Sequence, residues 1–394
     1  MSQIIPLSPI DHVFTGTGSY PIEFIFYYPG ILDEGQLRKS LEESLLYFPV
    51  ISSRLIKISE WSFGLETTRN GYVFETVHSS EDFQESNKEF LFIDPVESIE
   101  NEPLARFRLT YTPSGSVLGV SISHAVGDGF SYFHFLSSWA KLFHGQQIIL
   151  PDHSRNILIP SITGSQRKIS KNEILNDTGL FLEGKRKAYS REKLKWDIRK
   201  FPDEELKAMV GQVQKAGNSR LSVNDVLTAV LWKEYILKWM APGDPAQTYI
   251  SCPVDFRRIL PGFPKTYFGN AVVMATSSLD HDVLRETGIS ELSDRIRSIV
   301  AEVKPGYINK AVESLELIRN QEGLDIVERI HVSHPQSGLI VTNLSRLPLQ
   351  EIVFNCGPPV SYNILTSAVR GAVILPGTGG LEVRICYPQS SAES

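Results

Sequence analysis

An alternating strand followed closely by an amphipathic helix is the pattern that most constrains this fold. Between residues 117 and 124, Leu118, Val120 and Ile122 recur at every second position, which predicts a strand with one apolar face. Apolar side chains then recur at helical spacing over residues 130–143, and Gly145 ends that helix. This change from strand alternation to helical spacing within a few residues predicts a sheet with a helix packed on it.

Strands and helices alternate in both halves of the 394-residue chain, whereas residues 146–176 show neither period. We therefore expect an α/β fold, with α+β mixed sheets, in two units of similar size. The units expected are residues 1–150 and 196–394, joined by a crossover linker at 151–195. Other strands are predicted at 22–28, 105–112, 248–254, 269–276, 338–342 and 380–387, and other helices at 34–48, 222–239 and 284–303, the last with a weak point at Gly288.

Composition excludes several classes of protein. Hydrophobic residues make up 42% and charged residues 21% of the chain, as is ordinary for a globular protein. The net charge of −6 argues against nucleic acid as a partner. Three widely spaced cysteines form neither a disulfide framework nor a metal cluster, so we expect a cytoplasmic setting and no metal site. No apolar run is long enough to predict a membrane span.

One histidine has a sequence context that suggests chemistry. His124 stands at the predicted strand end and opens the run HAVGDG, which includes Asp128 and Gly129. An imidazole has an unperturbed pKa near neutrality, so it can take up and return a proton at cellular pH. A core histidine followed by a turn has the same pattern, so the motif alone leaves a catalytic and a structural interpretation open.

Several segments, in the same order along nearly the whole chain, resemble the BAHD acyltransferases, a plant and fungal family that moves acyl groups from coenzyme A thioesters. Residues 124–129 are similar to the family's His-x-x-x-Asp-Gly motif. The strongest second match is Asp255-Phe256-Arg257 followed by YFGNAV at residues 267–272. Further matches lie at residues 7–11, 48–55, 224–232, 341–348 and 379–383.

The chain departs from this family at two places. Family members carry Asp-Phe-Gly-Trp-Gly where this chain has VFNCG at residues 353–357, so only Phe354 and Gly357 match. Leu344 stands where the family has a tryptophan after the Val-Thr pair. Both departures affect the region that the resemblance assigns to coenzyme A.

The resemblance implies two chloramphenicol-acetyltransferase-like domains with a channel between them, His124 being carried by the N-terminal one. His124 would be the general base of a direct transfer through a ternary complex, because a thioester arrives already activated. Asp128 would pair with Arg257 and, with Gly129 in the turn, would support the site without touching substrate. The resemblance also implies that donor and acceptor enter from opposite faces.

The resemblance leaves the remaining site residues open. Thr342, Asn270, Tyr362 or a backbone N–H are candidates for the oxyanion donor, and Thr342 and Arg346 are candidates for coenzyme A contacts. We expect no permanently bound cofactor, with acyl-CoA as co-substrate. The other expected partner is a small alcohol or amine of specialised metabolism, and the protein is expected to be a monomer.

Two alternatives are weighed beside this interpretation. A condensation domain of a peptide synthetase would share the architecture and use a carrier-bound thioester, but Ser123 stands where its first histidine would be. A non-catalytic relative that binds a partner enzyme or an acyl chain is suggested by the altered stretch at residues 353–357. The intact His124 and Asp128 argue against the latter.

Overall fold

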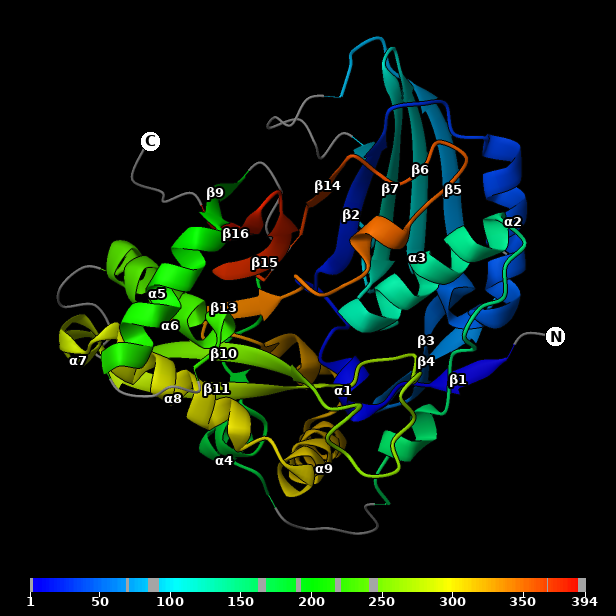
Figure 1. Ribbon diagram of the computed structural model, residues 1–394. Coiled ribbons are helices and arrows are strands. Elements are labelled where there is room, and N and C mark those ends of the chain that lie inside the picture. Colours follow the sequence, from blue (N-terminus) through cyan, green and yellow to red (C-terminus); the bar gives the residue numbers. More distant parts are fainter. Residues whose placement is uncertain are drawn as a thin grey trace.

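The strand that ends just before His124 is the middle strand of a five-stranded sheet, as the computed structural model in Figure 1 shows. All nine residues of β7 are buried, as expected for a strand covered on both faces. The sheet order is β14-β2-β7-β6-β5, and β7 is antiparallel to both of its neighbours. Its strands are β2 (Pro21–Tyr28), β5 (Tyr72–His78), β6 (Ala105–Thr112), β7 (Gly115–Ser123) and β14 (Ser361–Ile364).

Two helices, α2 (Glu34–Tyr47) and α3 (Gly129–Phe143), pack on one face of this sheet (Figure 1). The ring of Phe107 on β6 meets Trp139 on α3 edge-on, with centroids 5.5 Å apart. On the opposite face, a methyl group at Gly119 would lie 2.4 Å from the carbonyl oxygen of Phe92, so only glycine fits there. Both faces are thus covered, and the end of β7 is a rigid place for a side chain.

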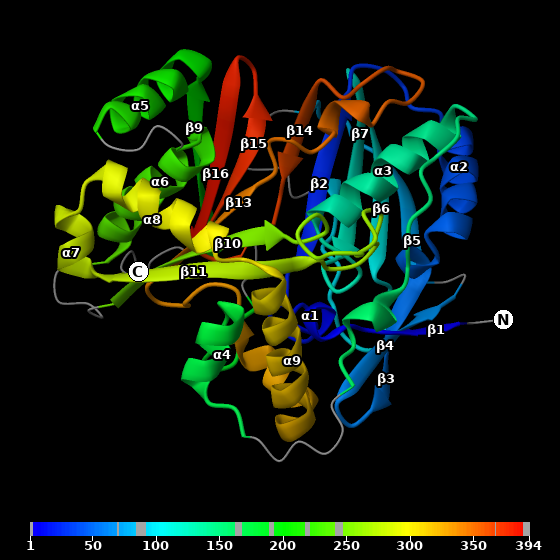
Figure 2. The ribbon, with the colours of Figure 1, turned by 60° about the horizontal axis from the view of Figure 1, so that its bottom comes forward.

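A six-stranded sheet forms the second unit, in the order β11-β10-β13-β15-β16-β9 (Figure 2). Helices α6 and α8 pack against it, while α4 and α9 pack together beside β11. The strands are β9 (Leu194–Pro202), β10 (Gln247–Asp255), β11 (Val272–Asp280), β13 (Gly338–Asn343), β15 (Gly371–Gly377) and β16 (Gly380–Pro388); the helices are α4 (Lys171–Thr178), α5 (Asp203–Ala216), α6 (Val223–Trp239), α7 (His281–Glu286), α8 (Ile289–Ala301) and α9 (Pro305–Glu322).

Smaller elements connect these units. They are the sheet of β1 (Ile4–Pro6), β4 (Ser62–Thr67) and β3 (Ser53–Ser59), the pair β8 (Phe181–Leu182) and β12 (Ile330–His331), the helix α1 (Pro9–His12), and short 3₁₀ turns at Pro49–Ser52, Arg155–Leu158, Leu324–Arg329 and Leu349–Glu351. The structure describes residues 3–68, 71–83, 92–161, 168–188, 193–216, 221–240, 247–366 and 368–388.

The secondary-structure predictions are confirmed in part. The strand at 105–112 and the helices beginning after Asp33 and Ser222 are present, with both caps hydrogen-bonded as their sequences predict. The single helix predicted at 284–303 is wrong, because the chain breaks at Gly288, a poor helix former, into α7 and α8. The strand predicted from residue 269 begins at Val272, since the backbone of residues 269–271 is bonded elsewhere.

Two findings bear on the predicted bounds of the two units, residues 1–150 and 196–394. The segment 151–195 holds α4, β8 and a 3₁₀ turn, while residues 162–167 and 189–192 within it lie outside the described residues. The strand β14, from the C-terminal half, pairs with β2 of the first sheet, Ile364 opposite Phe24. The two units therefore share a sheet, and the linker is not the only chain segment that joins them.

His12 connects the first helix to the small sheet. Its Nδ1 donates to the Ser8 carbonyl over 2.8 Å, and its Nε2 accepts the backbone N–H of Phe63 over 3.0 Å. Both ring nitrogens are thereby used by the neutral imidazole. Burial, assisted by the charge of Arg319, lowers the pKa of His12 to about 3.

We expect the free energy of unfolding to decrease as the pH falls below about 6.5, because the unfolded chain then binds a proton at residue 12 that the folded chain does not. This one site contributes about 1.4 kcal/mol per pH unit. Urea titrations of the wild type and His12→Gln between about pH 6.5 and about pH 4.5 measure the difference. Identical pH slopes in the two proteins would contradict the assignment.

Candidate active site

The imidazole of His124 is held from one side by an asparagine of the second unit. His124 follows directly after β7, and its Nδ1 lies 3.0 Å from Oδ1 of Asn270. The amide nitrogen of Asn270 donates to the His124 carbonyl and to Oδ1 of Asp11, each over 2.8 Å. Since this leaves the amide oxygen to face the ring, Nδ1 carries the proton and Nε2 has a free lone pair.

The other side of the imidazole is open. Among the described residues Nε2 has no hydrogen-bond partner, and it is not closed off from solvent. The ring of Phe14 stacks on the imidazole with centroids 3.8 Å apart, and Tyr20 meets it edge-on at 5.7 Å. Burial lowers the pKa of His124 below its usual value, against the opposing effects of its own backbone, Asp128, Asn270 and Asp11. The ring is therefore neutral at neutral pH, as a general base must be.

A buried ion pair stabilises the turn that carries His124. Arg257 and Asp128 are joined by two parallel hydrogen bonds of 2.8 and 2.9 Å, with both side chains at most 4% exposed. Asp128 also caps α3 through the N–H of Ser131 and accepts the N–H of Ala271, each over 3.0 Å. Burial raises the pKa of Asp128, but Arg257 and these hydrogen bonds outweigh it and hold the pKa below its usual value. The pairing implied by the resemblance is present.

A second buried ion pair was not found from the sequence. Asp11 is fully buried and is bonded to the guanidinium of Arg155, which also donates to the Val126 carbonyl. Asp11 closes a capping box with Ser8 and accepts the backbone N–H of Asn270 over 3.0 Å. The Ser8–Asp11 spacing was a usable signal for the cap. Nothing marked Arg155, which lies in the segment expected to be a linker.

The two ion pairs meet at one short segment. Asn270 donates its backbone N–H to Asp11, and the next residue, Ala271, donates its N–H to Asp128. The preceding carbonyl, of Gly269, accepts from Arg257 over 3.0 Å. Residues 269–271 thus join α1, the turn after β7 and β11, and the matched YFGNAV run is the joint between the two units.

Two other predicted site residues, Thr342 and Arg346, belong to the segment that runs from the end of β13 toward the start of α3. A methyl group at Gly129 would touch Leu344 and Leu347, at 3.4 and 3.6 Å, so residues 344–347 pack on the start of α3. Thr342 is half-buried at the end of β13. Arg346 is exposed and has no ion-pair partner within the described ranges.

Two candidates for the oxyanion donor have their polar hydrogens bonded within the protein. Tyr362 donates to the Pro376 carbonyl over 2.9 Å. Asn270 donates both amide hydrogens to Asp11 and His124, so its place is behind the imidazole rather than over a substrate carbonyl. This changes the role expected for Asn270 from the sequence.

The altered stretch at residues 353–357 docks on the first unit. Phe354 is buried, 5.3 Å from Trp139 between ring centroids. The side chain of Asn355 accepts the N–H of Asp33 over 3.0 Å and donates to the Ile31 carbonyl over 2.9 Å, and Cys356 donates to the same carbonyl. The stretch therefore holds the C-terminal chain against the loop between β2 and α2.

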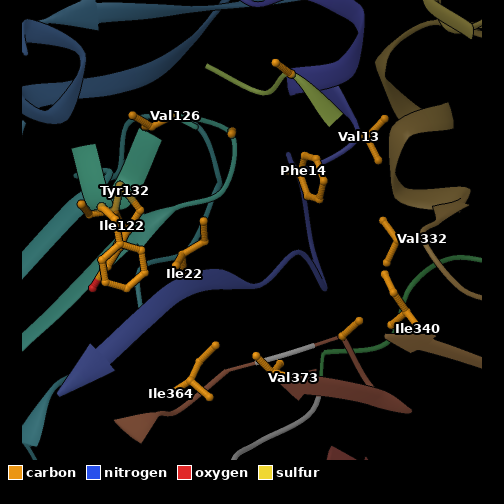
Figure 3. Packing of buried hydrophobic residues seen from close by; sticks show 14 of the residues in the cluster. Val13, Phe14, Ile22, Ile122, Val126, Tyr132, Val332, Ile340, Ile364 and Val373 are labelled. Atoms are coloured by element: carbon orange, nitrogen blue, oxygen red, sulfur yellow. The ribbon is translucent and has the colours of Figure 1, made fainter. Parts of the chain in front are cut away.

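Apolar side chains of both units belong to one core with the stacked ring of Phe14. Figure 3 shows part of this core, with Ile22 and Ile122 of the first sheet on one side of Phe14 and Val332 and Ile340 of the second unit on the other. A small apolar pocket borders Phe14 between α1, β11 and α9. A larger pocket of about 210 Å³ lies between β11, α4, α8 and α9, and His124 lines neither.

The described residues contain neither a metal-binding cluster nor a membrane-spanning helix. No group of three or more His, Cys, Asp or Glu side chains there is arranged to hold a metal ion. No helix in the described ranges combines the length and the apolar composition needed to cross a membrane.

Fold and site together define a two-unit, mixed-sheet protein with His124 at the joint between its sheets. A family model described as the Transferase family matches residues 1–393. The chain therefore belongs to the Transferase family, the BAHD acyltransferases that its motifs resemble, and is an acyltransferase.

Curated relatives match most of the chain. The hydroxycinnamoyl-CoA:5-hydroxyanthranilate N-hydroxycinnamoyltransferase HHT1 of Avena sativa is 26% identical over 380 residues, which cover 90% of this chain and 84% of the relative. The omega-hydroxypalmitate O-feruloyl transferase of Arabidopsis thaliana is 23% identical and covers 86% of this chain and 73% of its own length. One of these two relatives is thus named as an N-acyltransferase and the other as an O-acyltransferase.

Solved structures have the same fold. F. graminearum TRI101 complexed with ethyl coenzyme A superimposes with a TM-score of 0.77 at 14% identity, covering 98% of this chain and 95% of its own. Vinorine synthase superimposes with a TM-score of 0.71 at 17% identity, covering 99% and 94%. The expected fold class, two chloramphenicol-acetyltransferase-like domains, is confirmed.

We expect Asp128→Ala and Arg257→Ala to lower stability and activity together. Removing Arg257 leaves the Asp128 charge buried and uncompensated, which costs about 3–5 kcal/mol. Removing Asp128 leaves Arg257 still paired with the exposed Asp255, 3.0 Å away, so the loss of stability is smaller. Urea denaturation and turnover of each variant measure both effects. Glu60→Gln, which breaks the exposed pair with Lys57, is the control and changes stability by less than about 1 kcal/mol. A variant that unfolds like the wild type and loses only turnover would show that the pair has a direct catalytic role instead.

Proposed function

We propose that this protein transfers an acyl group from an acyl-CoA thioester to the hydroxyl or amine of a small molecule, with His124 as the general base. The observation that carries this proposal is the state of one ring: Asn270 holds Nδ1, Nε2 is open, and burial keeps the imidazole neutral. A base of this kind contributes about 10²–10⁴ in rate. The family, and relatives named as transferases using hydroxycinnamoyl-CoA, support the donor class.

The proposed reaction proceeds in one ternary complex. The acceptor O–H or N–H gives its proton to Nε2 of His124 as its lone pair attacks the thioester carbonyl. The tetrahedral intermediate then collapses, the C–S bond breaks, and the imidazolium returns the proton to the departing thiolate. No acyl-enzyme is needed, and burial raises the pKa of Cys252 and of Cys386 to about 12, which makes both poor nucleophiles.

Other residues have supporting roles in this proposal. Asn270 positions the imidazole, and Asp128 with Arg257 and Gly129 shapes the turn that carries it. Thr342 remains our candidate for the oxyanion donor. Arg346, exposed and unpaired in the described structure beside the start of α3, is our candidate for a coenzyme A phosphate.

The proposed donor and acceptor classes follow from the names of the relatives. We propose an aromatic acyl-CoA donor, because several relatives are named for hydroxycinnamoyl or feruloyl transfer, and either a hydroxyl or an amine acceptor, because both kinds of transfer occur among them. We further propose that the protein acts as a monomer. We propose no resident cofactor, because a thioester brings the acyl group already activated.

We expect His124→Ala to lose at least about 10²-fold in turnover, because no other base replaces Nε2. The assay follows thiol release from a panel of acyl-CoA donors, including p-coumaroyl-CoA. Calorimetric binding of free coenzyme A should be retained, which separates lost chemistry from lost folding. His78→Ala, at an exposed position on β5, is the matched control and should be fully active. Unchanged turnover in His124→Ala would refute the proposed base.

We expect the acid limb of kcat/KM to have its inflection below about pH 6.5, the usual value for histidine, because burial lowers the pKa of His124. The base form then predominates from that inflection up through neutral pH. Initial rates with p-coumaroyl-CoA between about pH 5 and about pH 8 measure the limb. An inflection above about 6.5 would contradict the neutral, desolvated ring.

A further inference from the structure

Tyr20 borders the catalytic imidazole, and its role is not explained by the mechanism above. Its ring is nearly perpendicular to both His124 and Phe14, at centroid distances of 5.7 and 6.4 Å. The other two rings are stacked only 3.8 Å apart. Tyr20 therefore lies alongside the stack, against the edges of both rings, rather than above either ring face.

The hydroxyl of Tyr20 has no hydrogen-bond partner among the described residues, although the ring is half-buried. Two buried tyrosines are satisfied internally: Tyr28 donates to the Ile352 carbonyl over 2.8 Å and Tyr132 to the Val120 carbonyl over 2.9 Å. The hydroxyl of a third, Tyr267, also has no partner among the described residues, but it is sealed within the protein. The Tyr20 hydroxyl is also not sealed within the protein. Burial raises the pKa of Tyr20, so the phenol stays neutral and keeps its proton to donate.

Arg186 of the linker segment and Glu328 of the second unit hold the loop that presents Tyr20 in place. Arg186 donates to the carbonyls of Val13, over 2.6 Å, and Thr15. Glu328 accepts the N–H of Thr17 over 3.0 Å. Gly18 has a φ of +74°, and a methyl group there would lie 2.8 Å from Cβ of Arg186, so the loop packs tightly under this clamp. A side chain on such a loop is preorganised, because its backbone does not have to be ordered when a ligand binds.

A preorganised donor beside the base favours a ligand that satisfies it. A site built to hydrogen-bond a polar group discriminates against the analogue that lacks the group, since the donor is then left unpaired. We propose that the Tyr20 hydroxyl donates a hydrogen bond to an oxygen of the acyl acceptor, adjacent to the hydroxyl or amine that gives its proton to His124. This inference rests on the proposed function and adds the class of acceptor: an alcohol or amine with a second oxygen close to its reacting group.

We assign Tyr20 to the acceptor rather than to the thioester because it lies on a different element from the candidate coenzyme A residues. The candidate coenzyme A residues Thr342 and Arg346 belong to the segment that packs on Gly129, at the start of α3. Tyr20 instead reaches His124 from the loop after α1. The candidate coenzyme A residues and Tyr20 thus lie on different elements, as two substrates in one ternary complex require.

The test compares Tyr20→Phe with the wild type, using p-coumaroyl-CoA as donor and two acceptor pairs. In one pair, 5-hydroxyanthranilate has a carboxylate beside its amine and 4-aminophenol does not; in the other, cis-1,2-cyclohexanediol has a second hydroxyl and cyclohexanol does not. For whichever of 5-hydroxyanthranilate and cis-1,2-cyclohexanediol the wild type acylates, we expect Tyr20→Phe to raise the acceptor KM about tenfold. That is the effect of one lost hydrogen bond. The KM of its partner, the KM of the donor and the acid limb of the pH profile should not change.

Tyr27→Phe is the matched control, because the Tyr27 hydroxyl bonds Ser114 at an exposed position away from His124. Its kinetics should equal those of the wild type, and the melting temperature of Tyr20→Phe should be unchanged, since no internal bond is lost. Equal acceptor KM values in Tyr20→Phe and the wild type, or a rise in donor KM alone, would overturn the role of Tyr20. Absence of transfer by the wild type with all four acceptors would instead overturn the proposed function, and this inference with it.

Discussion

The Asp128–Arg257 ion pair is the interaction on which the site depends. A buried carboxylate is stable only when it is paired and its remaining lone pairs are satisfied, and Asp128 meets both conditions through Arg257, the cap of α3 and the N–H of Ala271. Asp11 meets them through Arg155, Ser8 and the N–H of Asn270. Because the two N–H groups belong to consecutive residues, the two carboxylates together determine where the segment before β11 lies relative to β7.

The state of the imidazole follows from that placement. Once its backbone is anchored, Asn270 has one amide orientation that satisfies Asp11, and its oxygen then faces Nδ1 of His124. The same arrangement leaves Nε2 free at the joint between the units. Burial under Phe14 keeps the ring neutral. A neutral imidazole with an open Nε2 is thus produced by polar groups that hold the ring from its other side, which is how preorganised sites are built.

The region that departs most from the family pattern retains a structural task. Asn355 and Cys356 bond the loop before α2, and Phe354 packs against Trp139 in the core of the first unit. With β14, this segment is a second attachment of the C-terminal half to the first sheet. Loss of the family's acidic and tryptophan residues is therefore compatible with an intact fold and an intact histidine site, which weakens the case for a non-catalytic relative.

The sequence by itself determined the elements and the chemistry that is local in the chain. The spacing of apolar residues and the N-cap residues predicted β6, α2, α6 and the strand that leads to His124. Both signals are properties of residues that are neighbours in the chain. Resemblance paired Asp128 with Arg257 across 129 positions. Only the tertiary structure decided the rest: the pairing of Asp11 with Arg155, the change of Asn270 from oxyanion candidate to imidazole support, and the return of β14 to the first sheet. Each of these contacts joins residues far apart in the chain, which no periodic pattern relates. A buried charge, for example, selects its partner by distance in space and not by spacing in sequence.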